Sequence, residues 1–279
     1  MTTPVTDRGF AAGGCPRPSS KGEGSVMFSP EEREALRAEL LARARHDNRI
    51  SGGAVTGSGS IDALDRWSDV DLAFGVRDRD QLLPTLEDFT QFMRDGPGAI
   101  DTVDVRRDPW IYRVFLLPNT LQVDLAMAPA TDFGARTPSF RLAFGEARDA
   151  PHVPQPDPRE LIGYGWLYGL HVRSSITRRR PWQALYMLNS MRDQVVALAE
   201  LAAGLPAREA RGVDRLPARV RKPLEATIAA RLEIDELRRA FAATAAGLLR
   251  QARGVDPAFA ERLGPVLKLL VRTASDPSP

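Results

Sequence analysis

Three aspartates lie in segments whose residue pattern predicts β-strands, at positions that would share one face of a sheet. Asp69 and Asp71 flank Val70 in the run Asp-Val-Asp-Leu-Ala-Phe-Gly-Val, and alternation along a strand places both carboxylates on the same side. Their backbone positions would lie about 6.6 Å apart, so the carboxylates can approach a pair of metal ions from two sides. Asp124, within Gln-Val-Asp-Leu-Ala, is a third acid on another predicted strand. Together these oxygen ligands predict a Mg²⁺ site.

A simpler interpretation of these acids stays open, because an aspartate in an alternating pattern commonly faces solvent. Three inward-facing carboxylates favour a cation, since without one they repel each other and raise one another's pKa values. A Gly-rich segment, Ser51–Ser60, precedes the acids and is interpreted as a turn region that contains the Gly-Ser turn Gly57–Ser60. It is not a P-loop, because Lys21 is the sole lysine before residue 150, and a dinucleotide-binding turn would need glycine in place of Asp62.

The composition predicts a globular protein of two domains. The chain has 279 residues, of which 43% are hydrophobic and 27% charged. One cysteine and three histidines exclude a disulfide framework and a cysteine-rich zinc site. We expect a disordered tail at 1–27, a catalytic domain at 28–150 and a helical domain at 151–279. The net charge is −5 over residues 1–150 and +7 over the remainder, which suits a metal-binding half beside a half that binds a polyanion.

The patterning predicts an α+β fold, with a mixed sheet followed by an all-α helical bundle. A capping box at Ser29–Glu32 marks the first helix, and the Pro-rich stretch Asp149–Pro158 marks the domain boundary. Strands are predicted at 69–76, 100–105, 111–117 and 121–127. Helices are predicted at 81–93, 159–174, 182–203, after Pro217, at 231–253 and at 257–271.

The chain resembles the nucleotidyltransferase superfamily that includes DNA polymerase β. The resemblance rests on Gly57-Ser58, on Trp67-Ser68-Asp69-Val70-Asp71-Leu72 and on the later strand aspartate. Within the superfamily it is similar to antibiotic nucleotidyltransferases of the aminoglycoside and lincosamide type. The resemblance implies that Asp69, Asp71 and Asp124 bind metal, with Asp124 also a general base. It implies phosphate contacts for Gly57, Ser58 and Ser68.

The expected reaction is Mg²⁺-dependent transfer of a nucleoside monophosphate, most simply AMP from ATP, to a small-molecule hydroxyl, with release of pyrophosphate. Two magnesium ions and ATP or another nucleoside triphosphate are the expected cofactor and co-substrate, and an antibiotic-like compound is the expected acceptor. Transfer to protein or RNA, and a non-catalytic toxin–antitoxin type module, remain the alternatives. The absence of a long apolar run or signal-like N-terminus predicts a cytoplasmic protein without a membrane role.

The second domain offers candidate ligand contacts, each of which has an ordinary structural explanation. Its phosphate-binding candidates are Arg192, Arg173 and the run Arg178–Arg180. Carboxylates that a cationic acceptor would need occur at Asp193 and Glu200 of this domain and at Asp132 of the first domain. The aromatic group Trp166, Tyr168, Trp182 and Tyr186 could stack on a nucleobase or sugar, but core packing is the prediction for it and for His171.

Overall fold

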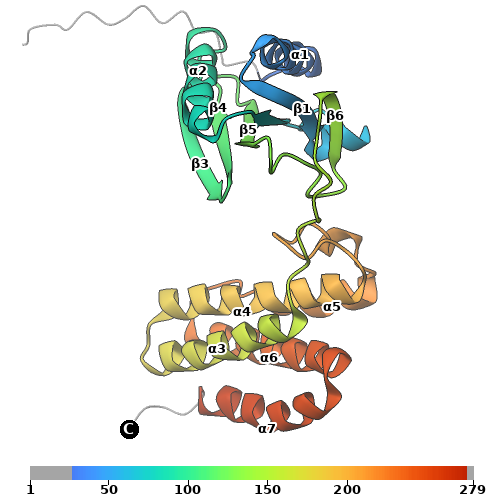
Figure 1. The fold of residues 1–279 in the computed structure, drawn as a ribbon. Coiled ribbons are helices and arrows are strands. Elements are labelled where there is room, and N and C mark those ends of the chain that lie inside the picture. The colour runs from blue at the N-terminus through green and yellow to red at the C-terminus, as the bar shows by residue number, and fades with distance from the viewer. Residues whose placement is uncertain (1–26, 275–279) are drawn as a thin grey trace, which may run out of the picture. The chain divides into compact units, whose positions relative to one another are not determined.

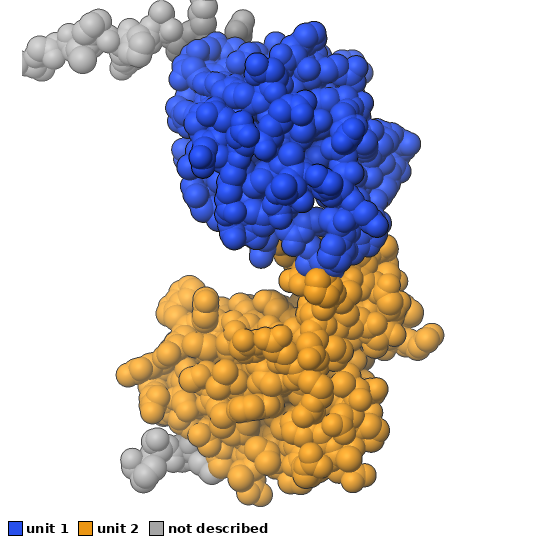
Figure 2. All heavy atoms as spheres, in the orientation of Figure 1, with its two compact units in different colours: residues 1–153 blue, residues 154–279 orange. Residues whose placement is uncertain are grey.

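The computed structural model describes residues 27–274, and its contacts divide the chain into two compact units, 1–153 and 154–279 (Figure 2). Unit 1 contains a mixed sheet with two longer helices, whereas unit 2 is built from helices (Figure 1). The chain is therefore an α+β protein, which confirms the predicted fold class. The predicted tail lies outside the described residues except for Met27.

The sheet of unit 1 has six strands in the order β3-β4-β5-β2-β1-β6. Strands β2 and β5 are parallel neighbours, and every other pair is antiparallel. The strands that carry the predicted carboxylates are thus adjacent at the centre of the sheet. Their bounds are β1 Ile50–Thr56, β2 Val70–Val76, β3 Asp101–Arg107, β4 Trp110–Leu116, β5 Gln122–Pro129 and β6 Phe140–Gly145.

Two of these strands, β1 and β6, were not predicted from the sequence. Glycines in β1 were interpreted as part of a Gly-rich turn segment, but they lie inside the sheet. A Cβ added at Gly53 would come within 2.4 Å of the Phe144 ring, and one at Gly52 within 2.6 Å of the Glu146 carbonyl oxygen. The glycines therefore allow β6 to approach β1 closely, which is a tertiary requirement.

Helices α1 (Pro30–His46) and α2 (Leu82–Asp95) cover one face of the sheet. The predicted capping box starts α1, since Ser29 and Glu32 each bond the other's backbone N–H. Under these helices lie alternate, fully apolar residues of the central strands. Those of β2 and β5 are Val70, Leu72, Phe74, Val76, Val123, Leu125 and Met127. Residues of opposite parity point to the other face, which no long helix among the described residues of unit 1 covers.

Unit 2 has its own apolar core, to which four long helices contribute. Within residues 27–274, no helix combines the length and the apolar composition that a membrane crossing requires. Short connecting elements, η3 (Val213–Arg215) and α5 (Ala218–Glu225), join the second and third long helices. The long helices are α3 Pro158–Thr177, α4 Pro181–Ala202, α6 Ile234–Val255 and α7 Pro257–Thr273.

Candidate active site

The predicted carboxylates gather on the open face of the sheet, where the parallel strands begin. Asp71 of β2 and Asp124 of β5 are direct partners across the parallel ladder. In-register neighbours point to the same face, so both side chains emerge on the side opposite the two helices. Asp69 immediately precedes β2, and its Oδ2 accepts a hydrogen bond of 3.3 Å from Gln122 of β5. The alternation rule therefore placed all three acids correctly on one side.

Asp124 shows the electrostatic cost of this arrangement. Burial, together with the nearby negative charge of Asp69, raises the pKa of its carboxyl to about 6. Its Oδ1 atom is buried and finds no hydrogen-bond donor among the described residues. An orphaned carboxylate oxygen beside another carboxylate fits a position that a cation would occupy.

The carboxylates do not form a closed metal cage as they stand. In the part of the chain that the structure describes, no three acidic, histidine or cysteine side chains are arranged to hold a metal ion. Like charges keep apart when no cation lies between them, which accounts for an open arrangement. The donor chemistry is nevertheless oxygen-only, and this suits Mg²⁺.

The Gly-Ser segment folds into a short 3₁₀ turn, η1 (Gly57–Ile61), directly against Asp71. Gly57 has a φ of +60°, and a Cβ there would lie 1.9 Å from Oδ2 of Asp71, so only glycine fits. The Ser60 hydroxyl donates to the Gly57 carbonyl at 2.8 Å, which closes the turn. Asp62 ends it in the left-handed region with a φ of 54°, where aspartate is tolerated in place of glycine. The predicted phosphate contact of Ser58 stays a prediction.

Ser68 has a structural task that the sequence interpretation missed. Its hydroxyl donates to Asp65 Oδ1 at 3.0 Å and accepts from the Asp65 backbone N–H at 2.9 Å. The single proton of this hydroxyl is thus directed to Asp65, and the expected phosphate contact of Ser68 stays a prediction. The side chain instead shapes the loop that leads into Asp69.

Arg33 of α1 fixes the same loop and was not predicted as a site residue. It is 4% exposed, and its guanidinium donates to the backbone carbonyls of Asp65 and Ser68. An arginine in the first turn of a helix opposes the helix dipole. This unfavourable placement was the one sequence feature that could have indicated a contact between Arg33 and a distant segment.

Next to the carboxylates, the open face carries a second apolar cluster of small and aromatic side chains, in which Ala73, Ala126, Trp110 and Phe133 are buried. Ala73 and Ala126 follow the two central acids along their strands, and Tyr112 pairs with Ala126 across β4 and β5. The Tyr112 ring stacks on Trp110 with centroids 5.9 Å apart. Burial raises the pKa of Tyr112; the Asp124 charge raises it too, whereas Arg136 and Arg107 act in the opposite direction. The Tyr112 hydroxyl therefore belongs to the same electrostatic surroundings as Asp124.

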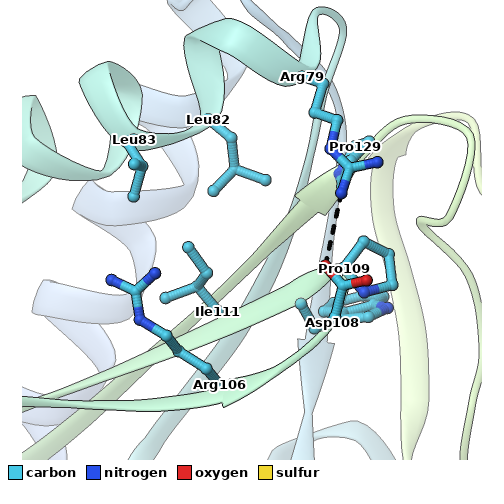
Figure 3. Close-up of a pocket in the computed structure, with 9 residues that line it drawn as sticks. Arg79, Leu82, Leu83, Arg106, Asp108, Pro109, Ile111 and Pro129 are labelled. Carbon is cyan, nitrogen blue, oxygen red and sulfur yellow. Dashed lines mark hydrogen bonds and ion pairs between the residues drawn. The ribbon is translucent and has the colours of Figure 1, made fainter.

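A separate cavity of about 280 Å³ lies at the other end of these strands (Figure 3). Pro129, the last residue of β5, lines it, which places it roughly 16 Å along the strand from Asp124. Arg79 pairs with Asp108 across its rim at 3.4 Å. None of the predicted site residues lines this cavity, so it is distinct from the carboxylate face.

The candidate cations of unit 2 differ in their surroundings. Arg192 donates to Asn189 Oδ1 at 2.9 Å and pairs with Asp193 at 3.4 Å, so its guanidinium is partly engaged within α4. Arg173 is half-buried, whereas the run Arg178–Arg180 is exposed between α3 and α4. Because the two units are described separately, a phosphate contact from any of these arginines stays a prediction.

Several predictions for unit 2 are wrong. Trp182 and Tyr186, assigned to the core from the sequence, are 74% and 69% exposed on α4, and His171 is exposed as well. Trp166 is also exposed, whereas Tyr168 does pack against the core.

Glu200 is not a surface carboxylate for a cationic acceptor. It is completely buried, and its Oε1 accepts from the Gly212 N–H at 2.7 Å. Burial raises the pKa of this carboxyl, against the backbone hydrogen bonds that lower it. Of the other predicted acids, Asp193 is exposed, while half-buried Asp132 accepts from Thr131 at 2.8 Å.

Comparisons with known proteins find similarity among solved structures. No protein-family model matches the chain, and no curated protein matches it in sequence. Among solved structures it is similar to an aminoglycoside 6-adenyltransferase from Bacillus subtilis, a nucleotidyltransferase, at 16% identity over 88% of this chain and 99% of that chain. The TM-score is 0.36, so the likeness carries no weight for activity. The functional proposal rests on the carboxylate face.

Proposed function

We propose that this protein is a magnesium-dependent nucleotidyltransferase that moves a nucleoside monophosphate, most simply AMP from ATP, onto a hydroxyl of a small molecule. The observation that carries the proposal is the register of Asp71 with Asp124, beside a turn whose Gly57 packs directly against Asp71. Paired acids next to a tight Gly-Ser turn suit a metal-bound triphosphate.

Asp69, Asp71 and Asp124 are the residues that would hold magnesium. The buried, unpartnered Oδ1 of Asp124 and the oxygen-only donor set support this assignment. Bound magnesium supplies charge stabilisation to the phosphate oxygens. Gly57 and Ser58 at the start of the η1 turn would orient the terminal phosphates through backbone and hydroxyl donors.

The transfer would use Asp124 as the group that accepts the acceptor's proton. The acceptor oxygen forms a bond to the α-phosphorus, the bond from that phosphorus to the bridging oxygen breaks, and pyrophosphate leaves. In the metal-free protein, burial and the charge of Asp69 raise the pKa of this carboxyl to about 6, and bound magnesium would lower it again. Positioning of the two substrates supplies much of the remaining rate enhancement.

A second acceptor class, RNA, is favoured by one observation in unit 2. Trp182 and Tyr186 lie one helical turn apart, both largely exposed, and directly follow the exposed run Arg178–Arg180. Exposed aromatic rings beside arginines are a common platform for unpaired bases and phosphates. Labelled nucleoside triphosphates offered with small molecules, proteins and RNA would separate the two: label in RNA alone would replace the small-molecule proposal.

Magnesium-linked nucleotide binding is the first test of the proposed function. With ATP near one hundred times its dissociation constant, binding stabilises the folded state by about 2.7 kcal/mol, which corresponds to a rise of roughly 5 to 10 °C in Tm for a unit of this size. We expect this rise in the wild type only when magnesium is present. Asp71→Asn, which keeps the side-chain shape, should lose most of it.

The matched control is Asp80→Asn, an exposed acid of unit 1 outside the carboxylate face. It should keep the full magnesium-linked rise, and all three proteins should melt alike without ligand. A wild type that gains no stability from ATP and magnesium would favour a non-catalytic module.

A further inference from the structure

The open face continues from the carboxylates across β4 to the edge strand β3. The ladder registers place Asp71, Asp124, Val114 and Val103 in one row across four neighbouring strands. A second row contains Ala73, Ala126, Tyr112 and Val105. Members of a row point to the same face. The row that begins with the two proposed catalytic acids, Asp71 and Asp124, therefore ends on an apolar surface.

We define the β3–β4 platform as the apolar part of these rows together with Leu116, which has the same parity on β4. Its members are Val103, Val105, Tyr112, Val114 and Leu116. Three of its members are exposed, with Val103 60%, Leu116 52% and Val105 42% accessible, and the other two are half-buried. Exposed aliphatic side chains gathered on one sheet face next to polar site residues are typical of a ligand-binding surface.

The order of the strands decides which substrate this platform serves. The η1 turn follows β1 and packs against Asp71, so the triphosphate side of the site lies toward β1. Strands β4 and β3 lie on the other side of Asp124. A nucleophile that gives its proton to Asp124 and attacks from the side opposite the leaving pyrophosphate must approach over β4 and β3.

The charges around the platform indicate the kind of acceptor. Asp101, which pairs with Leu116, is an exposed acid on the same face, whereas Asp104 belongs to the opposite face and is paired with Arg113. Near Tyr112, Arg107 and Arg136 contribute positive charge. Because Asp69, Asp71 and Asp124 would be neutralised by magnesium, a polycationic acceptor would be left with Asp101 and would face these arginines.

We propose that the β3–β4 platform binds the acceptor, and that the acceptor is an uncharged, hydroxyl-bearing small molecule with an apolar ring face rather than a polycation. This inference rests on the proposed function, because the acceptor side is defined by the role of Asp124. The apolar ring packs on Val103, Val105 and Tyr112, and this contact presents a neighbouring hydroxyl to Asp124.

The test uses three probes of known chemistry: phenyl β-glucoside, methyl β-glucoside and kanamycin. The two glucosides carry the same ring hydroxyls and differ in the apolar group, whereas kanamycin is polycationic. Their dissociation constants are measured by calorimetry on the full chain with magnesium and a non-hydrolysable ATP analogue. We expect phenyl β-glucoside to bind at least tenfold more tightly than either other probe.

The double variant Val103→Thr/Val105→Thr keeps the branched side-chain shape and replaces a methyl by a hydroxyl at each position. Loss of a methyl contact weakens binding roughly fourfold, so the phenyl preference should fall by about tenfold for the pair. Ile100→Thr is the matched control, because Ile100 is 65% exposed next to the same strand but has the parity of the opposite face. It should keep the full preference.

Each outcome decides the inference. A wild type that binds both glucosides equally, or prefers kanamycin, overturns it, as does a phenyl preference that survives in the double variant. The proposed function is judged separately by the magnesium-linked thermal shift. A phenyl preference without that shift would leave an apolar binding surface and remove the catalytic role.

Discussion

The two faces of the unit 1 sheet are built from the same strands but serve different ends. On the covered face, Leu72 and Leu125 lie fully buried beneath α1 and α2. One residue earlier in each strand, Asp71 and Asp124 face the other way, toward small residues and partial solvent. Stability and chemistry are thus assigned to alternate positions, so neighbouring residues should respond to mutation in opposite ways.

The largest expected effect is on the open face, from Gly57→Ala. The added Cβ meets Asp71 Oδ2, and the positive φ of Gly57 is strained for alanine, so the turn and the carboxylate must separate. We expect nucleotidyl transfer, measured as pyrophosphate release, to fall about a thousandfold, equivalent to about 4 kcal/mol of barrier.

Gly204→Ala is the control for backbone strain alone. Gly204 also has a positive φ, of 68°, but an added Cβ there meets nothing within 4 Å. It should lose up to about 1 to 2 kcal/mol of unfolding free energy and keep its activity. Equal activity losses in both variants would show that strain, rather than the position of Asp71, matters.

The next effect concerns the covered face. Leu125→Ala removes a fully buried side chain and leaves a cavity, so the free energy of unfolding should fall by about 3 kcal/mol in urea titrations. Its neighbour Asp124→Asn removes a buried, repelled charge and should leave stability unchanged or higher while transfer is lost. Equal losses of stability, or equal losses of transfer activity, in the two variants would contradict the assignment of stability to one face and chemistry to the other.

The smallest effect is a pH dependence of stability in the metal-free protein. The folded-state pKa of Asp124, about 6, lies above the ordinary value of 3.8 for an aspartate, so the folded state binds the proton more tightly than the unfolded state. Stability from this group is therefore present below about pH 4 and is lost as the pH rises through 6, by at most about 3 kcal/mol.

Urea titrations at several pH values in the presence of a chelator measure this slope. Asp124→Asn is the control and should remove that part of the pH dependence. A wild type and a variant with parallel pH profiles would show that Asp124 carries no such raised pKa.

Much of the fold could be predicted from local rules. The predictions that failed depended on contacts with distant segments. The capping box of α1 and the alternation of β2 and β5 were read correctly, since each depends on residues close in sequence. Strand β1 was missed because Gly52 and Gly53 indicate a turn unless the approach of β6 is known. Trp182 was assigned to the core because its hydrophobicity does not reveal whether another helix covers it.

The site shows the same limit. Asp69, Asp71 and Asp124 were recognised as candidates because residue type and period are written in the chain. The contact of buried Arg33 with the Asp65–Ser68 loop joins segments more than thirty residues apart. The hydrogen bond of Ser68 to Asp65 depends on the exact geometry of that loop. Such contacts leave little local pattern.

By itself, the sequence determined which side chains share a face of each strand, because side-chain alternation follows from backbone geometry alone. Only the tertiary structure decided that β2 and β5 are parallel neighbours, that Asp71 therefore stands beside Asp124, and that the row continues onto an apolar edge. Strand pairing depends on packing between distant segments, and no period within one strand records its neighbour.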